Sequence, residues 1–221
     1  MEDPRPFGLV PTAEDGRVLE FREKPTTPEE IVTDQINAGC YVFKRSVIDA
    51  IPAGRVVSVE RETFPGLLAS SARVYSFIDN AYWLDLGNPL AFAQGSRDLV
   101  TGLCPSSLVE QAGESLVAAG AQVAASAVVV GGSAIAERAV IGDGAEVRSC
   151  VVMADARIEA GAKLENTIIG VGAVVESYAV LTGTVVADGA RIGAENELIA
   201  GARVWPDQVI APKSIRFSAG E

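Results

Sequence analysis

Few side chains of this 221-residue chain are of the types that carry chemistry, and their spacing limits what that chemistry can be. The chain has no histidine, so it lacks the usual general base of acyl transfer and a common nitrogen ligand for zinc. Cys40, Cys104 and Cys150 do not have the spacing of a metal-ligand motif. A histidine-dependent site is therefore excluded, whereas an Asp or Glu could still act as a base.

Three short groups of polar residues stand out, but each has an ordinary explanation when taken alone. Glu23 and Lys24 could be an exposed pair that closes a strand. Asn37 and Gly39 beside an apolar run indicate a bulge. Asp85 could cap a helix or lie in a loop. What these groups do therefore depends on the elements that position them.

Composition and charge restrict the partners and the compartment. The net charge of −11 argues against a nucleic-acid partner, because such partners attract clustered Lys and Arg. Residues 115–136 carry no charge, but they are mainly Ala, Val, Gly and Ser, and their pattern continues into charged sequence at Glu137 and Arg138, so we expect no membrane helix. The N-terminus has no export signal, and an odd number of cysteines suits a reducing compartment. We expect a cytoplasmic protein.

The strongest pattern is a repeat of about six residues in the C-terminal half, in which an aliphatic residue is usually followed four positions later by a small one. Six is not a multiple of the helical period, whereas short strands that turn at fixed intervals can use it. The pattern predicts a left-handed parallel β-helix of about five coils, each of about eighteen residues and three faces. One-residue slips near residues 151, 168 and 185 indicate shortened corners. The repeated aliphatic residues are Val117, Val123, Val129, Ile135, Ile141, Val147, Val152, Ile158, Leu164, Ile169, Val175, Leu181, Val186, Ile192, Leu198, Val204 and Ile210.

The first hundred residues predict a mixture of strands and helices. Residues 89–100 read as a helix with Asn88 as its cap and Pro89 at its first position. Residues 61–70 have helical spacing interrupted by Pro65. The predicted strands are 7–12, 17–22, 36–43, 74–77 and 82–86, the first two forming a hairpin. We predict domains at 1–104 and 115–211, a linker at 105–114 and a tail at 212–221.

Four segments taken in order carry a resemblance that none carries alone. The segments are FGLVPTAEDGRVLEFREKP (7–25), INAGCYVF (36–43), VSVERETFP (57–65) and YWLDLGNP (82–89). Together they resemble the second half of the catalytic domain of the sugar-phosphate nucleotidyltransferases. The third segment and residues 195–218 are similar to the mannose-1-phosphate guanylyltransferase branch. The resemblance implies the C-terminal half of a Rossmann-like nucleotidyltransferase domain (α/β) followed by the β-helix.

The resemblance also implies a reaction. In this family an oxygen of a sugar 1-phosphate attacks the α-phosphorus of a nucleoside triphosphate, and pyrophosphate leaves. This branch implies mannose 1-phosphate and GTP as substrates, with Mg²⁺ as cofactor. Such a transfer requires charge neutralisation and alignment more than proton removal, because the nucleophile is already anionic. A site without histidine therefore suits this reaction.

Particular residues match the family's motifs. By resemblance, Lys24 holds the sugar phosphate, Glu23 accepts hydrogen bonds from sugar hydroxyls, and Asn37 offers its amide to the sugar ring. Gly39 lets the backbone approach the ligand. Asp85 supplies a carboxylate to Mg²⁺, which takes few protein ligands. Residues 60–62 are expected to be a solvated helix start without a catalytic role.

The chain departs from the family's pattern at its beginning. The glycine-rich loop Gly-x-Gly-Thr-Arg and a further aspartate for the metal are not in this sequence, so we expect the chain alone to be inactive. A second hypothesis is a regulatory subunit that binds sugar phosphate or sugar nucleotide without turnover. A third is a β-helix acyltransferase, which the absence of histidine disfavours. Because β-helices of this kind commonly associate, we expect a homo-oligomer.

Overall fold

The computed structural model describes residues 4–25, 27–107, 109, 112–199 and 201–216. The chain divides into two compact units, an N-terminal unit (Met1–Trp83) and a C-terminal unit (Leu84–Glu221). This division lies after Trp83, whereas the sequence predicts that the first domain ends at residue 104. The predicted domain boundaries stay a prediction. Each unit is described by itself.

The N-terminal unit is built on a short antiparallel pairing. Strand β1 (Gly8–Leu9) pairs with β2 (Arg22–Glu23), and single bridges join Thr12 to Val18 and Leu9 to Ile36. The predicted hairpin is confirmed, although its regular strands are shorter than expected. The predicted strand at 36–43 is wrong beyond Ile36, because the chain turns at Gly39, whose φ is +77° and whose N–H donates to Asn37 Oδ1. A short 3₁₀ turn, η1 (Pro28–Glu30), follows β2.

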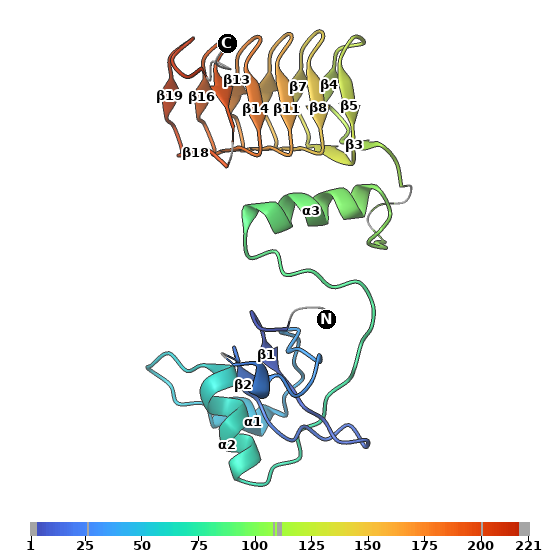
Figure 1. The fold of residues 1–221 in the computed structure, drawn as a ribbon, viewed down its shortest axis with the longest axis vertical. Coiled ribbons are helices and arrows are strands. Elements are labelled where there is room, and N and C mark those ends of the chain that lie inside the picture. Colours follow the sequence, from blue (N-terminus) through green and yellow to red (C-terminus); the bar gives the residue numbers. More distant parts are fainter. Residues whose placement is uncertain (1–3, 26, 108, 110–111, 200, 217–221) are drawn as a thin grey trace. The chain divides into compact units, whose positions relative to one another are not determined.

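The N-terminal unit has three helical segments, one of which carries the centre of an aromatic cluster. They are α1 (Arg45–Asp49), a π-helical turn η2 (Val59–Thr63) and α2 (Phe64–Ala69) (Figure 1). The buried ring of Phe64 stacks on Phe21 at 4.3 Å between centroids and also contacts Tyr41 and Phe43. The predicted helix at 61–70 is confirmed, whereas α1 was not predicted. The side chain of Ser58 caps η2 by accepting from the Arg61 N–H.

The C-terminal unit begins with the helix that the sequence predicts. Helix α3 spans Pro89–Val100, and Asn88 Oδ1 accepts from the Ala91 N–H at 3.0 Å. The preceding segment, 82–86, forms no strand, so the prediction there is wrong; the chain bends after it at Gly87, whose N–H donates to Asp85 Oδ1. Helix α3 packs against β6 where Gly132 has no side chain, since a Cβ there would lie 2.5 Å from Arg97 Cγ.

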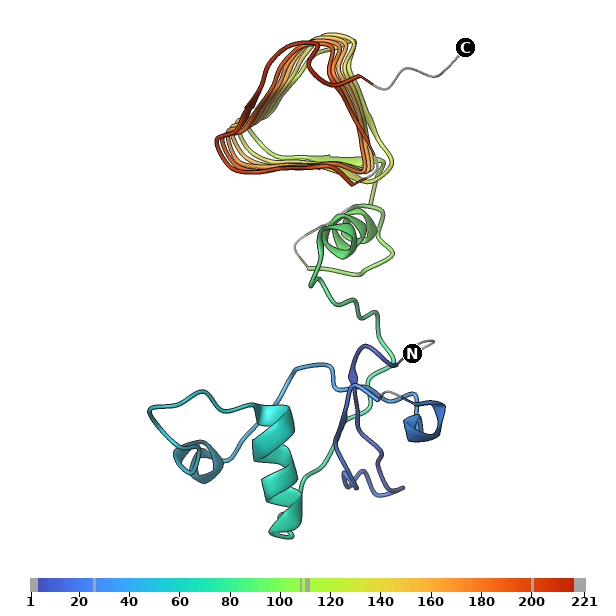
Figure 2. The same ribbon diagram turned by 60° about the vertical axis from the view of Figure 1, so that its left-hand side comes forward.

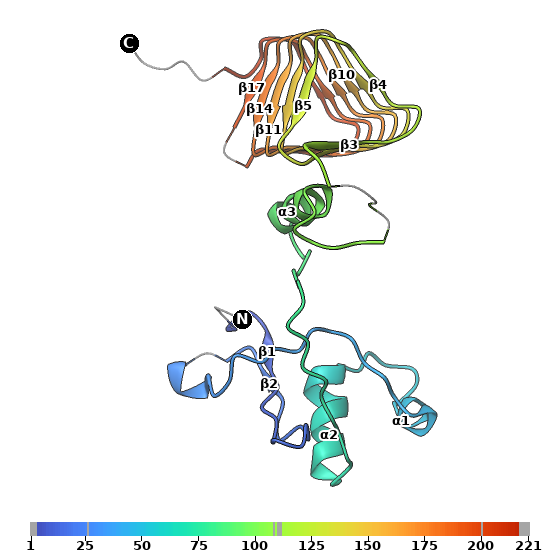
Figure 3. The ribbon, with the colours of Figure 1, turned by 90° about the vertical axis from the view of Figure 1, so that its right-hand side faces the viewer.

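The rest of the C-terminal unit is a left-handed parallel β-helix, as predicted. Figure 2 shows its triangular cross-section, and Figure 3 shows the strands of successive coils lying side by side. Two of its three sheets have six strands and the third has five, so it has close to six coils instead of about five. Its strands are β3 Ser115–Val117, β4 Gln122–Val123, β5 Val128–Val130, β6 Ser133–Ile135, β7 Val140–Ile141, β8 Glu146–Arg148, β9 Val151–Val152, β10 Arg157–Ile158, β11 Lys163–Glu165, β12 Ile168–Ile169, β13 Val174–Val175, β14 Val180–Thr182, β15 Val185–Val186, β16 Arg191–Ile192, β17 Glu197–Leu198, β18 Arg203–Val204 and β19 Val209–Ile210.

The repeat explains why the coils stack. The repeated aliphatic side chains point inward, and those from Ile135 to Leu198 are at most 2% exposed. Val117 pairs with Ile135 and Ile135 with Val152, so the second step is one residue shorter. In the longer step, the corner between β5 and β6 contains Gly131 and Gly132, both with positive φ. In the shorter step, the corner between β8 and β9 has positive φ only at Ser149. The slips in the repeat are therefore shortened corners, as predicted.

The final coil is closed by residues 211–216, which we call the C-terminal strap. Asn196 is fully buried, and its Nδ2 donates to the carbonyls of Gly193 (2.7 Å) and Ala211 (2.8 Å). Its Oδ1 accepts from the Ile215 N–H at 2.8 Å. Glu195 adds ion pairs to Lys213 and Arg216. One buried amide thus joins β17 to the strap.

The three cysteines differ in their environment, and this predicts their reactivity. Burial raises the pKa of the Cys150 thiol to about 12, and that side chain is 1% exposed, whereas Cys40 is exposed. We expect iodoacetamide at pH 8 to alkylate Cys40 and to spare Cys150 until the β-helix unfolds, because the thiolate is the nucleophile. Peptide mass spectrometry with and without urea measures this. Equal labelling of the two thiols in the folded chain would contradict the buried position of Cys150.

Candidate functional site

The residues expected to contact a sugar come together around one glycine of β1. Gly8 pairs with Glu23 across the β1–β2 ladder, and on its other side its carbonyl accepts from the Asn37 N–H at 2.8 Å. A Cβ on Gly8 would lie 2.7 Å from Glu23 Oε2. The absence of a side chain therefore lets the Glu23 carboxylate lie against the backbone beside Asn37. The structure brings together two residues that are distant in sequence.

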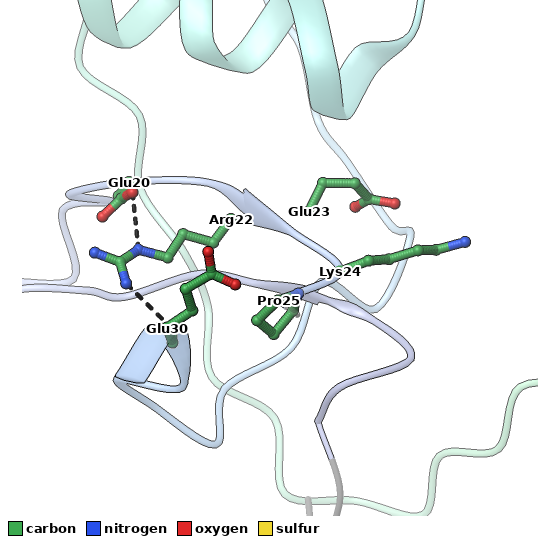
Figure 4. A pocket seen from close by; sticks show the side chains of 6 residues that line it. All are labelled: Glu20, Arg22, Glu23, Lys24, Pro25 and Glu30. Carbon is green, nitrogen blue, oxygen red and sulfur yellow. Dashed lines mark hydrogen bonds and ion pairs between the residues drawn. The ribbon is translucent and has the colours of Figure 1, made fainter. Parts of the chain in front are cut away.

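An open depression of about 540 Å³ lies along β2 and η1, lined by Glu20, Arg22, Glu23, Lys24, Pro25 and Glu30. The Arg22 guanidinium is paired with Glu20 at 2.8 Å and donates to the Glu30 carbonyl at 3.2 Å. Lys24 extends away from that guanidinium (Figure 4), and within the described residues its ammonium has no ion-pair partner. Lys24 is thus the cation of this depression that can bind an anion.

The backbone of Lys24 is in an uncommon conformation. Its φ is +52°, in the left-handed region that non-glycine residues rarely adopt, and the next residue is the buried Pro25. Such conformations cost about 1–3 kcal/mol and are held by their surroundings, often at functional sites. The exposed lysine side chain is therefore presented from a constrained backbone.

The Asn37 side chain is part of a hydrogen-bond network. Its Oδ1 accepts from the Gly39 N–H at 3.1 Å, and its Nδ2 lies 2.6 Å from the Tyr41 hydroxyl. That hydroxyl lies 3.1 Å from Glu60 Oε1, and Ser58 Oγ donates to Glu60 Oε2 at 3.2 Å. A Cβ on Gly39 would meet no atom within 4 Å, and the approach of a ligand there stays a prediction.

The pKa values of this network favour a charged carboxylate next to a neutral phenol. The backbone N–H of Glu60 lowers the pKa of its carboxyl, and the hydroxyls of Tyr41 and Ser58 lower it further. Burial raises the pKa of Tyr41, and the nearby carboxylates of Glu60 and Glu23 raise it further. Glu60 is half-buried, so the expectation of a solvated residue is wrong there, whereas Arg61 and Glu62 are exposed as expected.

Asp85 belongs to the C-terminal unit and stays a predicted metal ligand. It is exposed, and its Oδ1 accepts from the Gly87 N–H, whereas its Oδ2 has no hydrogen bond to the described residues. Among the described residues, no group of three or more Cys, Asp or Glu side chains is arranged to hold a metal ion. A single carboxylate nevertheless fits Mg²⁺, which commonly keeps water and phosphate oxygens in its shell.

No helix in the described part of the chain is long and apolar enough to span a membrane.

Sequence reasoning did not find every residue of this site. Gly8 looks like an ordinary strand residue until its pairing with Glu23 and Asn37 is known. Tyr41 lies in an aromatic strand pattern, which hides its hydroxyl contacts. Glu60 lies in the VSVERETFP segment, whose resemblance was the one signal that could have pointed to it.

The fold and the site define an α/β unit in which Lys24 and Glu23 line one depression, followed in sequence by a left-handed β-helix. Residues 1–102 match the family model described as nucleotidyl transferase, and residues 111–217 match the GMPPB C-terminal domain. The two matches together span nearly the whole chain. The chain belongs to the nucleotidyl transferase family over residues 1–102 and to the GMPPB C-terminal domain family over residues 111–217.

Two curated relatives and one solved structure are similar to this chain over different lengths. Mannose-1-phosphate guanylyltransferase of Mycobacterium tuberculosis is 48% identical over 219 residues, which are 98% of this chain and 60% of the relative. Mannose-1-phosphate guanylyltransferase catalytic subunit beta of Drosophila pseudoobscura is 36% identical over 47% of this chain and 25% of its own length. A solved structure of perosamine N-acetyltransferase from Caulobacter crescentus covers 66% of this chain and 83% of its own, with 22% identity and a TM-score of 0.42. The chain thus spans 60% or less of the length of these two curated relatives.

Proposed function

We propose that this chain supplies the sugar-phosphate part of a nucleotidyltransferase site that joins GTP to mannose 1-phosphate and releases pyrophosphate. The observation that carries the proposal is the meeting of Glu23 and Asn37 around Gly8, next to Lys24, whose ammonium has no ion-pair partner among the described residues. The choice of mannose and guanine is supported by the 48% identical relative. The activity belongs to a complete site, of which this chain supplies a part.

Each residue has a task that its chemistry allows. The Lys24 ammonium binds the sugar phosphate, which lowers the repulsion between two anionic reactants and aligns the attacking oxygen. Glu23 accepts hydrogen bonds from sugar hydroxyls, and the Asn37 amide can both donate and accept. Asp85 would hold Mg²⁺, which when bound supplies charge neutralisation at the triphosphate. Gly39 leaves the backbone open to the sugar.

The binding half of the proposal is tested with the full chain and mannose 1-phosphate in a calorimetric titration. We expect saturable binding that mannose alone and inorganic phosphate reproduce only weakly, because the site combines a cation with hydroxyl acceptors. Equal binding of phosphate and mannose 1-phosphate would show an unspecific anion site and would overturn the role of Glu23 and Asn37.

Substituting Gly8 tests whether its missing side chain matters. In Gly8→Ala the new methyl group displaces the Glu23 carboxylate but leaves Asn37 Cβ at 3.7 Å, so we expect binding of mannose 1-phosphate to weaken about tenfold, as for one lost hydrogen bond to a charged group. The matched control is Gly66→Ala in α2, where a Cβ meets no atom within 4 Å. Unchanged affinity in Gly8→Ala would mean that Glu23 does not contact the sugar.

Two further parts of the proposal concern assembly and compartment. We propose a homo-oligomer, supported by exposed apolar side chains on the first coil, with Leu116 and Val117 each 43% exposed. Sedimentation velocity distinguishes an oligomer from a monomer. We propose a cytoplasmic location, supported by the three cysteines being free thiols.

A further inference from the structure

We propose that Glu60, acting through the Tyr41 hydroxyl, sets the orientation of the Asn37 side-chain amide and thereby helps to select the sugar. Glu60 and Tyr41 are positioning residues in this view, and Asn37 is the group that contacts the ligand. The inference rests on the proposed function, since it assigns a partner to one of its binding residues.

The orientation follows from the donors and acceptors of the network. The Tyr41 hydroxyl has one hydrogen, and both Asn37 Oδ1 (2.9 Å) and Glu60 Oε1 (3.1 Å) lie within its reach. An ionised carboxylate can only accept, so the hydrogen is best placed toward Glu60. The Tyr41 oxygen then accepts from Asn37 Nδ2 at 2.6 Å, and Asn37 Oδ1 is left to accept from the Gly39 N–H.

This arrangement leaves a donor where a sugar hydroxyl needs one. The second hydrogen of Asn37 Nδ2 is not used by the network, and the Glu23 carboxylate on the other side of Gly8 is an acceptor. A hydroxyl group both donates and accepts, so an amide hydrogen and a carboxylate oxygen together are complementary to it. If the amide were reversed, its oxygen and the carboxylate would both be acceptors.

We call the hydrogen-bonded series Glu60, Tyr41 hydroxyl and Asn37 amide the relay. Its Glu60 and Tyr41 members are held in place by the surrounding residues. The Tyr41 ring contacts Phe64 and Phe43 with centroids 5.0 and 5.8 Å apart, so its hydroxyl is held in place by packing. Glu60 lies in η2, where Ser58 both caps the turn and donates to the Glu60 carboxylate. Packing and capping therefore hold the hydroxyl and the carboxylate independently of any ligand.

The test uses the full chain with Tyr41→Phe and Glu60→Gln, and Glu62→Gln as control. Tyr41→Phe keeps the ring packing and removes the hydroxyl of the relay. Glu60→Gln replaces a group that only accepts by an amide that can also donate, so the direction of the Tyr41 hydroxyl is no longer fixed. Glu62 is exposed, lies in the same turn and pairs with Arg55 at 2.7 Å. Two readouts are measured: the NMR signals of the Asn37 side-chain amide without ligand, and the affinity for mannose 1-phosphate.

We expect both relay variants to shift the Asn37 amide signals and to weaken binding of mannose 1-phosphate about three- to tenfold, the scale of one hydrogen bond. Glu62→Gln should change neither. If the relay variants bind as tightly as the parent chain while Lys24→Met loses binding, the inference is overturned and the proposed function stands. If the parent chain itself binds no mannose 1-phosphate, the proposed function falls and the inference with it.

Discussion

Lys24→Met is expected to weaken binding of mannose 1-phosphate by about a hundredfold, the scale of charge-assisted hydrogen bonds to a phosphate. The other cation lining the depression, Arg22, is paired with Glu20 and with the Glu30 carbonyl, so it cannot replace the lost ammonium without giving up those contacts. Methionine keeps most of the length of the lysine side chain, so the substitution mainly removes its positive charge. Calorimetric titration measures the affinity.

The matched control for this substitution is Lys44→Met. Lys44 is also exposed and lies at the start of α1, outside the residues that line the depression. Its substitution removes one positive charge from the same unit, as Lys24→Met does. If the two variants lose affinity equally, the effect is one of overall charge, and Lys24 does not bind the phosphate.

Asn196→Ala is expected to destabilise the β-helix by about 3 kcal/mol, because it removes the three hydrogen bonds that this fully buried amide makes with the Gly193 and Ala211 carbonyls and the Ile215 N–H. The free energy of unfolding is measured by urea titration followed by circular dichroism. Gln208→Ala, at an exposed position of the last coil, should stay within about 0.5 kcal/mol of the parent chain. Equal stability of the two variants would mean that the amide of Asn196 does not hold the strap.

The β-helix could be predicted because its information is local. Each strand pairs with the strand one coil away, as Ile141 does with Ile158, so the pattern that buries the aliphatic residues is visible in sequence as a short period. The corners could be predicted for the same reason. Helix α3 was predictable because Asn88 and Pro89 are local start signals whose effect does not depend on distant residues.

The N-terminal unit was less predictable because its strands depend on context. Residues 36–43 have a strand-like composition, yet the Asn37 side chain bonds to the Gly39 N–H and turns the chain away from the ladder. Residues 82–86 likewise have a strand-like composition and form no strand. Side-chain-to-backbone bonds of this kind compete with sheet pairing, and apolar alternation alone does not reveal them.

The sequence predicts which residues form the candidate site, but it does not predict the residues that position them. Motif resemblance predicts Glu23, Lys24 and Asn37 as contacts for a sugar phosphate, which stays a prediction, and the structure brings Glu23 and Asn37 together. The contributions of Gly8 and of Tyr41 with Glu60 arise from pairings between segments far apart in sequence. The sequence does not reveal these contributions, because hydrogen-bond direction and the space above a glycine are properties of the folded chain.

The proposed reaction is tested most directly in a chimera. In it, this chain replaces the matching 219-residue portion of the Mycobacterium tuberculosis mannose-1-phosphate guanylyltransferase, which supplies the part of the relative that this chain does not span. Pyrophosphate release is measured with GTP, mannose 1-phosphate and Mg²⁺. We expect turnover that is lost in Lys24→Met and kept in Lys44→Met. A folded chimera without turnover, or one in which Lys24→Met is as active as the parent, would contradict the assignment.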